Sequence, residues 1–281
     1  MATTHEQFWV RKPGKFDLAD MPTKPEADLE REAVETMTEQ LGKEMEELLD
    51  LLFFAGKHGF LIVLQGMDTA GKDGTIRHML RFTHAQSVRV ASFKVPTPQE
   101  LAHDFLWRCH DKTPGKGETV IFNRSHYEDV GVVRVHNLVD ESVWKKRFDH
   151  INAFENLLVD SNTIVLKVFL HISKEEQEER LLEREQDAED AWKLSVNDWK
   201  ERRYWKEYQE AYSDAIGKCA SQDAPWLVVP GDKKWFRNYI VTQAVVETLK
   251  PYREEWMESL KQVGKEAKKE LERFRIAAPQ K

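Results

Sequence analysis

The first long pattern in the chain is an apolar stripe between positions 28 and 56 that repeats mostly every three or four residues. Its members are Leu29, Val34, Met37, Leu41, Met45, Leu48 and Leu52. Residues three and four apart lie on one face of an α-helix, so this spacing predicts an amphipathic helix. Gly56 and Gly59 follow the stripe and favour a stop, because glycine readily ends a helix.

After this helix, short apolar runs alternate with helical patterns. We expect strands at residues 60–65, 87–93, 119–123, 163–170 and 226–229. We expect helices at residues 73–82, 98–109, 141–159, 174–185 and 233–249. Thr97 precedes the second of these helices and is a good N-cap residue. Such alternation, with right-handed crossovers, predicts an α/β fold: a three-layer α/β/α sandwich around a five-stranded parallel sheet.

The two ends of the chain lack this alternation. Residues 1–27 contain three prolines and no clear period, so we expect an extended arm packed on the surface. The main domain should span residues 28–250. In the tail, 251–281, apolar residues return at helical spacing over 252–275. We expect a helix docked on its own domain rather than a dedicated partner-binding helix.

Composition indicates a soluble globular protein. Of the 281 residues, 41% are apolar and 32% are charged, and no apolar run approaches the roughly 20 residues that a membrane helix needs. Residues 1–15 carry no signal-peptide core, and Cys109 and Cys219 suit unpaired thiols in a reducing compartment, so we expect a cytoplasmic location. The formal net charge of −7 argues against a general nucleic-acid binder, although a local basic groove could still bind a polyanion.

The sharpest chemical signal is a glycine-rich turn after the first expected strand. It consists of Gly66, Met67, Asp68, Thr69, Ala70, Gly71, Lys72, Asp73 and Gly74. A glycine, four residues, a second glycine and a lysine form the Walker A spacing, in which backbone N–H groups and a helix N-terminus surround phosphates. We predict that the turn binds phosphate and that Lys72 pairs with its terminal oxygens. A tight turn without a ligand is the alternative, and the lysine after Gly71 argues against it.

Two carboxylates in this turn depart from the usual motif. Asp73 occupies the position where a Ser or Thr hydroxyl normally binds magnesium, and Asp68 lies inside the turn. A phosphate cradle alone needs no negative charge, whereas a hard cation such as Mg²⁺ prefers carboxylate oxygens. We therefore expect a metal site centred on Asp68, with help from Asp73 or Glu128.

The third expected strand ends in a second polar cluster. P-loop enzymes usually place a metal-binding acidic residue here, but this strand ends in the neutral Asn123, and the nearest carboxylates follow at Glu128 and Asp129. The planar guanidinium of Arg124 suits a bidentate contact with phosphate. His126 is a candidate substrate contact, as is Asn123. A phosphohistidine at His126 is conceivable, but a hydrogen-bonded structural histidine is the preferred interpretation.

Residues 175–206 are dense in charge, and their segment from about 180 to 206 is the candidate lid. Arg180 and Arg184 are four residues apart and share one helix face, and Lys193 follows. Taken alone, the pattern is typical of a solvated helix pair with surface salt bridges. After a phosphate loop and a fourth strand, however, nucleotide kinases place a lid whose arginines close onto the transferring phosphate.

Several of these segments together resemble the type-2 polyphosphate kinase family. The similarity covers roughly residues 30–250, and its motifs occur in the family's order. The segments are 66–74, 92–96, 122–128, 192–208 and 224–226. The resemblance implies a P-loop fold like that of thymidylate kinase, a divalent cation (Mg²⁺ or Mn²⁺), and phosphate transfer between inorganic polyphosphate and nucleotides.

Carried over by motif, the resemblance also implies roles for single residues. Asp68 would be the catalytic carboxylate that organises the metal, with Lys72 on phosphate and Asp73 close to it. Arg124 would contact the transferred phosphate, and Glu128 the nucleotide or the metal. The further implied contacts are Arg180, Arg184 and Lys193 in the lid and Lys94 in a basic groove for polyphosphate.

The choice of acceptor depends on the exit of the third strand. Asn123 together with Glu128 resembles the members that accept nucleoside monophosphates, including those that perform both the AMP and the ADP step. We therefore expect direct, in-line and reversible transfer to AMP and ADP or to GMP and GDP. An ATP-dependent nucleotide kinase on the same fold is the alternative, and a nucleotide-gated switch is a more distant one. The tail and the resemblance favour a homo-oligomer, a dimer or a tetramer.

Overall fold

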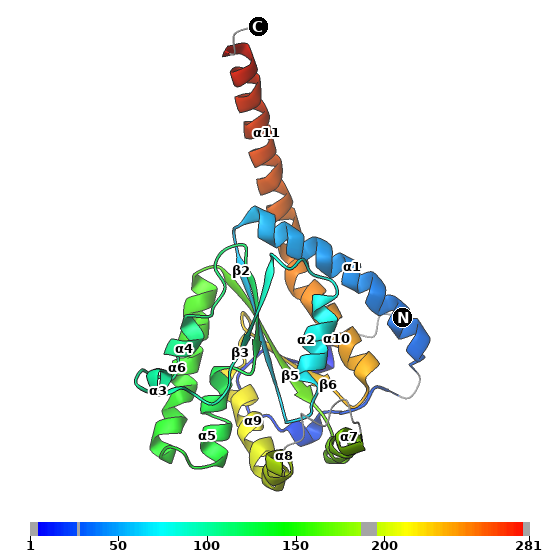
Figure 1. The fold of residues 1–281 in the computed structure, drawn as a ribbon, viewed down its shortest axis with the longest axis vertical. Helices are drawn as coiled ribbons and strands as arrows, with labels where there is room; N and C mark the ends of the chain where they lie inside the picture. The colour runs from blue at the N-terminus through cyan, green and yellow to red at the C-terminus, as the bar shows by residue number, and fades with distance from the viewer. Residues whose placement is uncertain (1–4, 27–28, 187–195, 278–281) are drawn as a thin grey trace.

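The computed structural model describes residues 5–26, 29–186 and 196–277, which form a three-layer α/β/α sandwich (Figure 1). The strands are β1 (Trp9–Val10), β2 (Gly59–Gly66), β3 (Val88–Ser92), β4 (Thr119–Asn123), β5 (Thr163–His171) and β6 (Trp226–Pro230). Their order is β1-β6-β5-β2-β4-β3, and all neighbours pair in parallel except β1 with β6. The predicted fold class is therefore confirmed.

Helices cover both faces of the sheet. The longer ones are α1 (Arg31–Ala55), α2 (Lys72–Leu80), α6 (Glu141–Asp160), α7 (Lys174–Gln186), α9 (Trp205–Cys219), α10 (Lys234–Leu249) and α11 (Arg253–Ala277). The shorter ones are α3 (Pro98–Leu101), α4 (Trp107–His110), α5 (Val132–Val135) and α8 (Val196–Glu201). One apolar core lies between the sheet and α1, α2 and α10, and a second between the sheet and α6 and α9. None of the helices in the described ranges combines the length and apolarity needed to cross a bilayer.

The central strand β2 shows why the sheet must be covered on both sides. Phe60, Ile62 and Leu64 pack into the core under α1 and α10, whereas Leu61 and Val63 pack into the core under α6 and α9. Each of these five side chains is buried. A strand buried on both faces reads as a continuous apolar run, and this run is what the sequence contains.

The predicted count of five strands is wrong, because the N-terminal arm adds a sixth. Trp9 and Val10 pair antiparallel with Leu227 and Trp226 of β6. Two residues are too few for a recognisable alternation, so the strand is defined by its partner and not by its own pattern. The pairing also protects the edge of β6, which would otherwise expose unpaired backbone groups.

The predicted helix over residues 98–109 is two short helices. Thr97 caps α3 as expected, with its side chain accepting from the N–H of Glu100 and the Glu100 carboxylate accepting from the N–H of Thr97. The Asp104 carboxylate then accepts hydrogen bonds from the N–H groups of Leu106 and Trp107. An aspartate that bonds nearby backbone N–H groups starts a new helix rather than continuing the old one.

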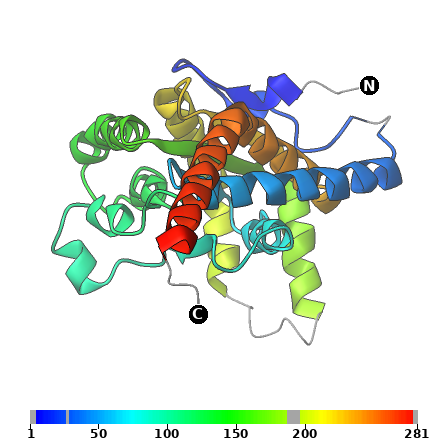
Figure 2. The ribbon, with the colours of Figure 1, turned by 90° about the horizontal axis from the view of Figure 1, so that it is seen from above.

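The tail forms the predicted helix, but only its first turns dock on the domain. Trp256 is fully buried and donates from Nε1 to Nδ1 of His58, and Glu255 pairs with Lys57. Beyond Leu260 every described side chain of α11 is exposed, and the helix projects from the domain (Figure 1). Figure 2 shows α11 crossing over α1 before it leaves. The predicted helix is confirmed, but the prediction that it docks on its own domain holds only for its first turns.

Candidate active site

The loop from 66 to 71 joins the carboxyl end of β2 to the N-terminus of α2. Gly66, Thr69 and Gly71 have φ angles of 153°, 63° and 97°. A Cβ on Gly66 would lie 2.8 Å from the carbonyl oxygen of Leu170 on the neighbouring strand, so no side chain fits there. The turn directs the N–H groups and the positive end of α2 towards the edge of the sheet, which is a favourable arrangement for an anion.

Lys72 folds back onto this loop. Its Nζ donates to the carbonyl oxygens of Gly66 (2.8 Å) and Met67 (3.1 Å). Burial lowers the pKa of Lys72, and the nearby Arg124 lowers it further, while the carboxylates around the loop raise it. Backbone carbonyls thus hold the ammonium group beside the loop, where phosphate oxygens could replace them as its partners.

Arg124 joins the two predicted carboxylates at the exit of β4. Its Nη2 lies 2.8 Å from Oδ1 of Asp68, and its Nη1 lies 2.9 Å from Oε2 of Glu128. Its backbone has a φ of 63°, a conformation that is uncommon outside glycine. Burial opposes the charge, but Glu128 and Asp68 outweigh it and raise the pKa of Arg124. The structure therefore brings together three residues that lie 56 and 4 positions apart in the chain.

A buried polar network supports this cluster. Glu155 of α6 forms an ion pair with Lys167 of β5 and accepts hydrogen bonds from the Tyr127 hydroxyl (2.8 Å) and the His126 ring (Nε2, 3.2 Å). Burial would raise the pKa of Glu155, but Lys167 and His126 lower it. The His126 ring is completely buried, so it offers no surface to a ligand in this structure. Its geometry matches the structural interpretation and not the substrate contact.

The other candidates near the loop fall into two groups. Asn123 donates from Nδ2 to Oδ1 of Asp73 (2.8 Å), so the end of β4 contacts the first turn of α2. Lys94 lies just beyond β3 and is exposed. Its backbone carbonyl accepts a hydrogen bond from Nη1 of Arg108 (2.8 Å). The structure places Lys94 at the same edge of the sheet as the loop but does not join the two.

The two predicted lid arginines have different surroundings: Arg180 contacts the phosphate loop, and Arg184 contacts another part of the candidate lid. Arg180 of α7 is buried and donates to the carbonyl oxygens of Thr69 (3.0 Å) and Gly231 (2.7 Å). Arg184 forms a 3.3 Å ion pair with Asp198. Burial raises the pKa of Asp198, Asp68 raises it further, and Arg184 lowers it. Lys193 lies outside the described residues, as does part of the segment predicted to be the lid.

Five residues around the site were missed by the sequence reasoning: Val132, Gln177, Glu201, Tyr208 and Tyr212. A small hollow in front of Asp68 and Arg124 is also lined by Gly66, Met67, Val132, Gln177, Glu201, Tyr208 and Tyr212. Of these, Gln177 donates from Nε2 to the backbone oxygen of Asp68 (3.0 Å), and the Tyr208 hydroxyl donates to Glu201 (2.7 Å). Gln177 precedes Arg180 by three positions and Arg184 by seven, so its helix face was a usable signal. Glu201 and Tyr208 lie in the segment 192–208 that carries the family resemblance but were not singled out within it, and no pattern marked Val132 or Tyr212.

The carboxylates of the site suit a hard cation only together with phosphate. No group of three His, Cys, Asp or Glu side chains in the described ranges is arranged to hold a metal ion. Oε1 of Glu128, however, is buried and has no hydrogen-bond partner. Mg²⁺ is commonly bound by one or two carboxylates together with substrate phosphates and water. Asp68 and Glu128 are the residues that fit such an ion.

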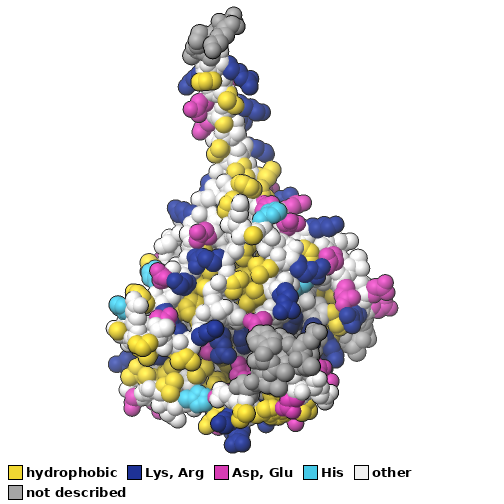
Figure 3. All heavy atoms as spheres, viewed as in Figure 1, with side chains coloured by type: hydrophobic (Ala, Val, Ile, Leu, Met, Phe, Trp, Pro, Cys, Tyr) yellow, Lys and Arg dark blue, Asp and Glu magenta, His cyan; other side chains and the backbone are white. Residues whose placement is uncertain are grey.

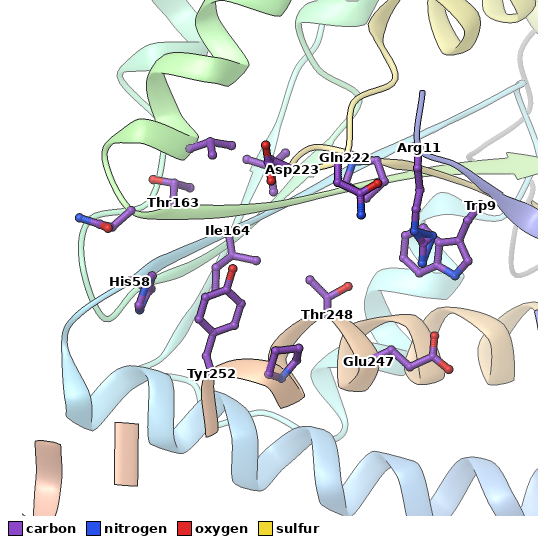
Figure 4. Close-up of a pocket in the computed structure, with 15 residues that line it drawn as sticks. Trp9, Arg11, His58, Thr163, Ile164, Gln222, Asp223, Glu247, Thr248 and Tyr252 are labelled. Carbon is purple, nitrogen blue, oxygen red and sulfur yellow. The ribbon is translucent and has the colours of Figure 1, made fainter. Parts of the chain in front are cut away.

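A larger hollow lies at the opposite end of the sheet (Figure 4). Its volume is about 460 Å³, and its walls include Trp9, Arg11, His58, Thr163 and Tyr252. Trp9 and Arg11 come from the N-terminal arm, His58 and Thr163 lie at the amino ends of β2 and β5, and Tyr252 lies in the turn before α11. Open parallel sheets bind ligands at the carboxyl ends of their strands, so we place the active site at the phosphate loop despite the smaller hollow there.

Fold and site together define a P-loop phosphotransferase: a parallel sheet whose central strand leads into a Walker A turn, with an arginine and carboxylates beside it. The chain belongs to the Polyphosphate kinase 2 family, whose model matches residues 28–256. This confirms the predicted resemblance and the prediction that the protein is an enzyme.

Individual relatives are similar along most of their length. A protein of Meiothermus ruber named AMP/ADP-polyphosphate phosphotransferase is 48% identical over 246 residues, covering 87% of this chain and 92% of the relative. An ADP-polyphosphate phosphotransferase of Rhodopseudomonas palustris is 40% identical, covering 87% and 89%. The crystal structure of Polyphosphate Kinase 2 from Arthrobacter aurescens TC1 superposes with a TM-score of 0.84 at 37% identity, covering 88% and 89%.

Proposed function

We propose that this chain transfers the terminal phosphate of inorganic polyphosphate to AMP and ADP. The observation that carries the proposal is the cluster of Arg124, Asp68 and Glu128 beside the Walker A turn, with ion pairs of 2.8 and 2.9 Å. The name of the relative that is 48% identical supports the choice of acceptors. The proposal includes GMP and GDP as further acceptors, since no described contact identifies a base.

The reaction requires two phosphate anions to meet end to end. Lys72 and Arg124 supply the positive charge that offsets their repulsion, and the N-terminus of α2 adds its dipole. The attacking oxygen belongs to a phosphate that is already ionised at neutral pH, so the site needs little general-base help. Positioning and charge neutralisation are then the main contributions of the protein.

A divalent cation, Mg²⁺ or Mn²⁺, would polarise phosphate oxygens and offset their charge when bound. Asp68 and Glu128 would hold it, and Asp73 is held near them through Asn123. In the structure, Asp68 and Glu128 both contact Arg124. We infer that Arg124 keeps these carboxylates in place before substrate arrives and then turns its planar group to the transferred phosphate.

The arginines of α7 serve the loop in different ways. Arg180 is bonded to the backbone at Thr69 and Gly231, so we assign it the task of fixing the loop against the β6–α10 connection. Arg184 is partly exposed and pairs with Asp198 among the described residues, so it is the better candidate for contact with phosphate. Gln177 holds the backbone of Asp68 and thereby the direction of its carboxylate.

The donor assay tests the proposal directly. Purified protein is incubated with polyphosphate, Mg²⁺ and either AMP or ADP, without ATP, and the nucleotides are separated chromatographically. We expect ADP from AMP and ATP from ADP. Turnover with ATP and AMP but not with polyphosphate would instead identify an ordinary nucleotide kinase. The same assay with GMP and GDP measures base preference.

We also propose that the protein is a homo-oligomer and that α11 contributes to its interface. Val263, Leu271 and Phe274 are exposed on the projecting helix. With Leu260 and Ala267 they follow the spacing of three and four that forms a seam between two helices. Figure 3 shows apolar side chains along this helix. Light scattering should give a dimer or tetramer, and Leu271→Glu with Phe274→Glu should lower the mass, whereas Lys269→Glu on the opposite face should not.

A further inference from the structure

Arg237 is a buried cation without an acidic partner in the described part of the chain. It lies in the first turns of α10 and is only 3% exposed. Its Nε and Nη2 both donate to one neutral oxygen, Oδ1 of Asn238, at 3.2 and 2.8 Å. A buried charge is normally paired, because removing it from water is costly. This arginine therefore calls for an explanation.

The guanidinium group of Arg237 lies against the phosphate loop. A Cβ built on Gly71 would be 2.1 Å from its Nη1, and one built on Gly74 would be 3.4 Å from its Nη2. The Cβ position of Gly71 also lies 3.6 Å from Nη1 of Arg180. Two arginines thus approach the same glycine, and this glycine is the N-cap of α2.

The surroundings of Arg237 make its charge less favourable still. Burial, and then the neighbouring Arg180, lower its pKa to about 10. The N-terminus of α2 carries a partial positive charge of its own. Arg180 already has Glu176 and backbone carbonyls as partners, so it shares no acid with Arg237. Among the described residues, Arg237 therefore adds a positive charge beside the loop that no carboxylate offsets.

We propose that Arg237 is a phosphate-binding residue whose missing counter-ion is a phosphate group of the substrate held by the loop. This rests on the proposed function and adds a residue that neither the Walker A motif nor the lid pattern identified. The ligand class is an oligophosphate, contributed by the polyphosphate donor or by the phosphate of the nucleotide. Figure 3 shows several Lys and Arg side chains on the face of the molecule that carries α2, which agrees with a polyanion approaching there.

A packing role and a phosphate-binding role make opposite predictions. If Arg237 only fills space, replacing it should weaken the folded state and leave anion binding unchanged. If Arg237 binds a substrate phosphate, Arg237→Met removes a buried charge that has no acidic partner in the ligand-free protein. The ligand-free variant should then be as stable as the parent or more stable. The same change should weaken phosphate binding, because a charge-assisted contact is lost.

The test compares four proteins: the full chain and its variants Arg237→Met, Arg237→Lys and Arg253→Met. Arg253 is an exposed arginine at the start of α11, so its loss controls for the change in total charge. Affinities for inorganic tripolyphosphate and for AMP are measured by calorimetry, and the ligand-free Tm by differential scanning. We expect Arg237→Met to bind one of the two ligands roughly ten- to a hundredfold more weakly. Arg237→Lys should fall between, and Arg253→Met should match the parent.

The two ligands also separate the sources of the anion. A loss confined to tripolyphosphate assigns Arg237 to the donor, and a loss confined to AMP assigns it to the acceptor. Unchanged affinity for both, or a lower ligand-free Tm with intact binding, would overturn the proposal. Should Arg237→Met fail to fold, the affinity of Arg237→Lys decides in the same way. Because binding is measured without turnover, a negative donor assay would leave this result standing.

Discussion

The two ends of the sheet contain hollows of very different character. At the amino ends of the strands, a hollow of about 460 Å³ has walls such as Thr163, Thr248 and Tyr252. At the carboxyl ends, a far smaller hollow is lined by Gly66, Asp68 and Arg124. The second has a helix N-terminus, a backbone turn and ion-paired charges, and the first has no such combination. The comparison explains why we place the proposed phosphate site by directed backbone groups and charge rather than by volume.

We expect the largest effect from a change at Asp68, in the active site at the carboxyl ends of the strands (the active end). Asp68→Asn keeps the size of the side chain but removes the charge that pairs with Arg124 and that the proposed metal site needs. We expect turnover to fall roughly a thousandfold while nucleotide affinity changes little, because the lost interaction acts mainly in the transition state. Steady-state kinetics with polyphosphate and ADP measure both quantities. A near-normal kcat in this variant would contradict the assignment.

A smaller loss of turnover should follow when the planar guanidinium group of Arg124 is replaced but its positive charge is kept. Arg124→Lys can pair with Asp68 or Glu128 but cannot reproduce the two contacts of 2.8 and 2.9 Å together. We expect kcat to fall on the order of a hundredfold. Circular dichroism and Tm check that the fold is retained. Full activity would show that a point charge suffices and that bidentate recognition plays no part.

The helix that carries the loop should also make the active end sensitive to acid. His78 of α2 is buried, and its Nε2 lies 3.0 Å from Oγ1 of Thr242. Burial is the main cause that lowers the pKa of His78 to about 4, and the positive charges of Arg81 and Arg237 lower it further. Glu39 has a weaker, opposite effect. Between about pH 6.5 and pH 4, His78 is protonated in the unfolded chain but stays neutral in the folded chain. The free energy of unfolding therefore falls as the pH falls through this range. His78→Gln should reduce the drop in Tm between pH 7 and pH 5. An identical drop in both proteins would remove His78 as a cause.

The smallest effect is expected at the amino end. Thr248→Ala alters the wall of the larger hollow, far along the strands from the phosphate loop. We expect kcat and KM to stay within about twofold of the parent, since surface changes away from special features are usually mild. The donor assay with AMP and with ADP measures this. A strong loss of activity would show that the larger hollow influences the reaction at the opposite end of the sheet.

Much of the active end could be predicted from local sequence. The Walker A turn requires glycines at fixed positions before a helix, and the apolar run of β2 places it at the carboxyl end of a strand. Residues 119–128 likewise contain an apolar strand pattern followed directly by polar residues, which predicted the second polar cluster. Such features depend on neighbours within a few positions, so periodicity and motif spacing reveal them.

Other features depended on partners that are distant in the chain. Trp9 and Val10 became a strand only because β6 offered an edge, and Arg180 proved to be bonded to the backbone of Thr69 and Gly231. The tail showed helical spacing whether it docked or projected, so the pattern could not distinguish the two. Long-range packing decided each of these, and it leaves no mark on local periodicity.

By itself the sequence determined the layers of the sandwich, the phosphate loop and the family, because each is written in spacing along the chain. The tertiary structure alone decided that Arg124 joins Asp68 to Glu128 and that Arg237, which pairs with no carboxylate of the described residues, lies against Gly71. The electrostatic free energy of a charged side chain depends on whether that side chain is paired, buried or exposed. This in turn depends on which distant segments fold against it, and the local sequence does not show those segments.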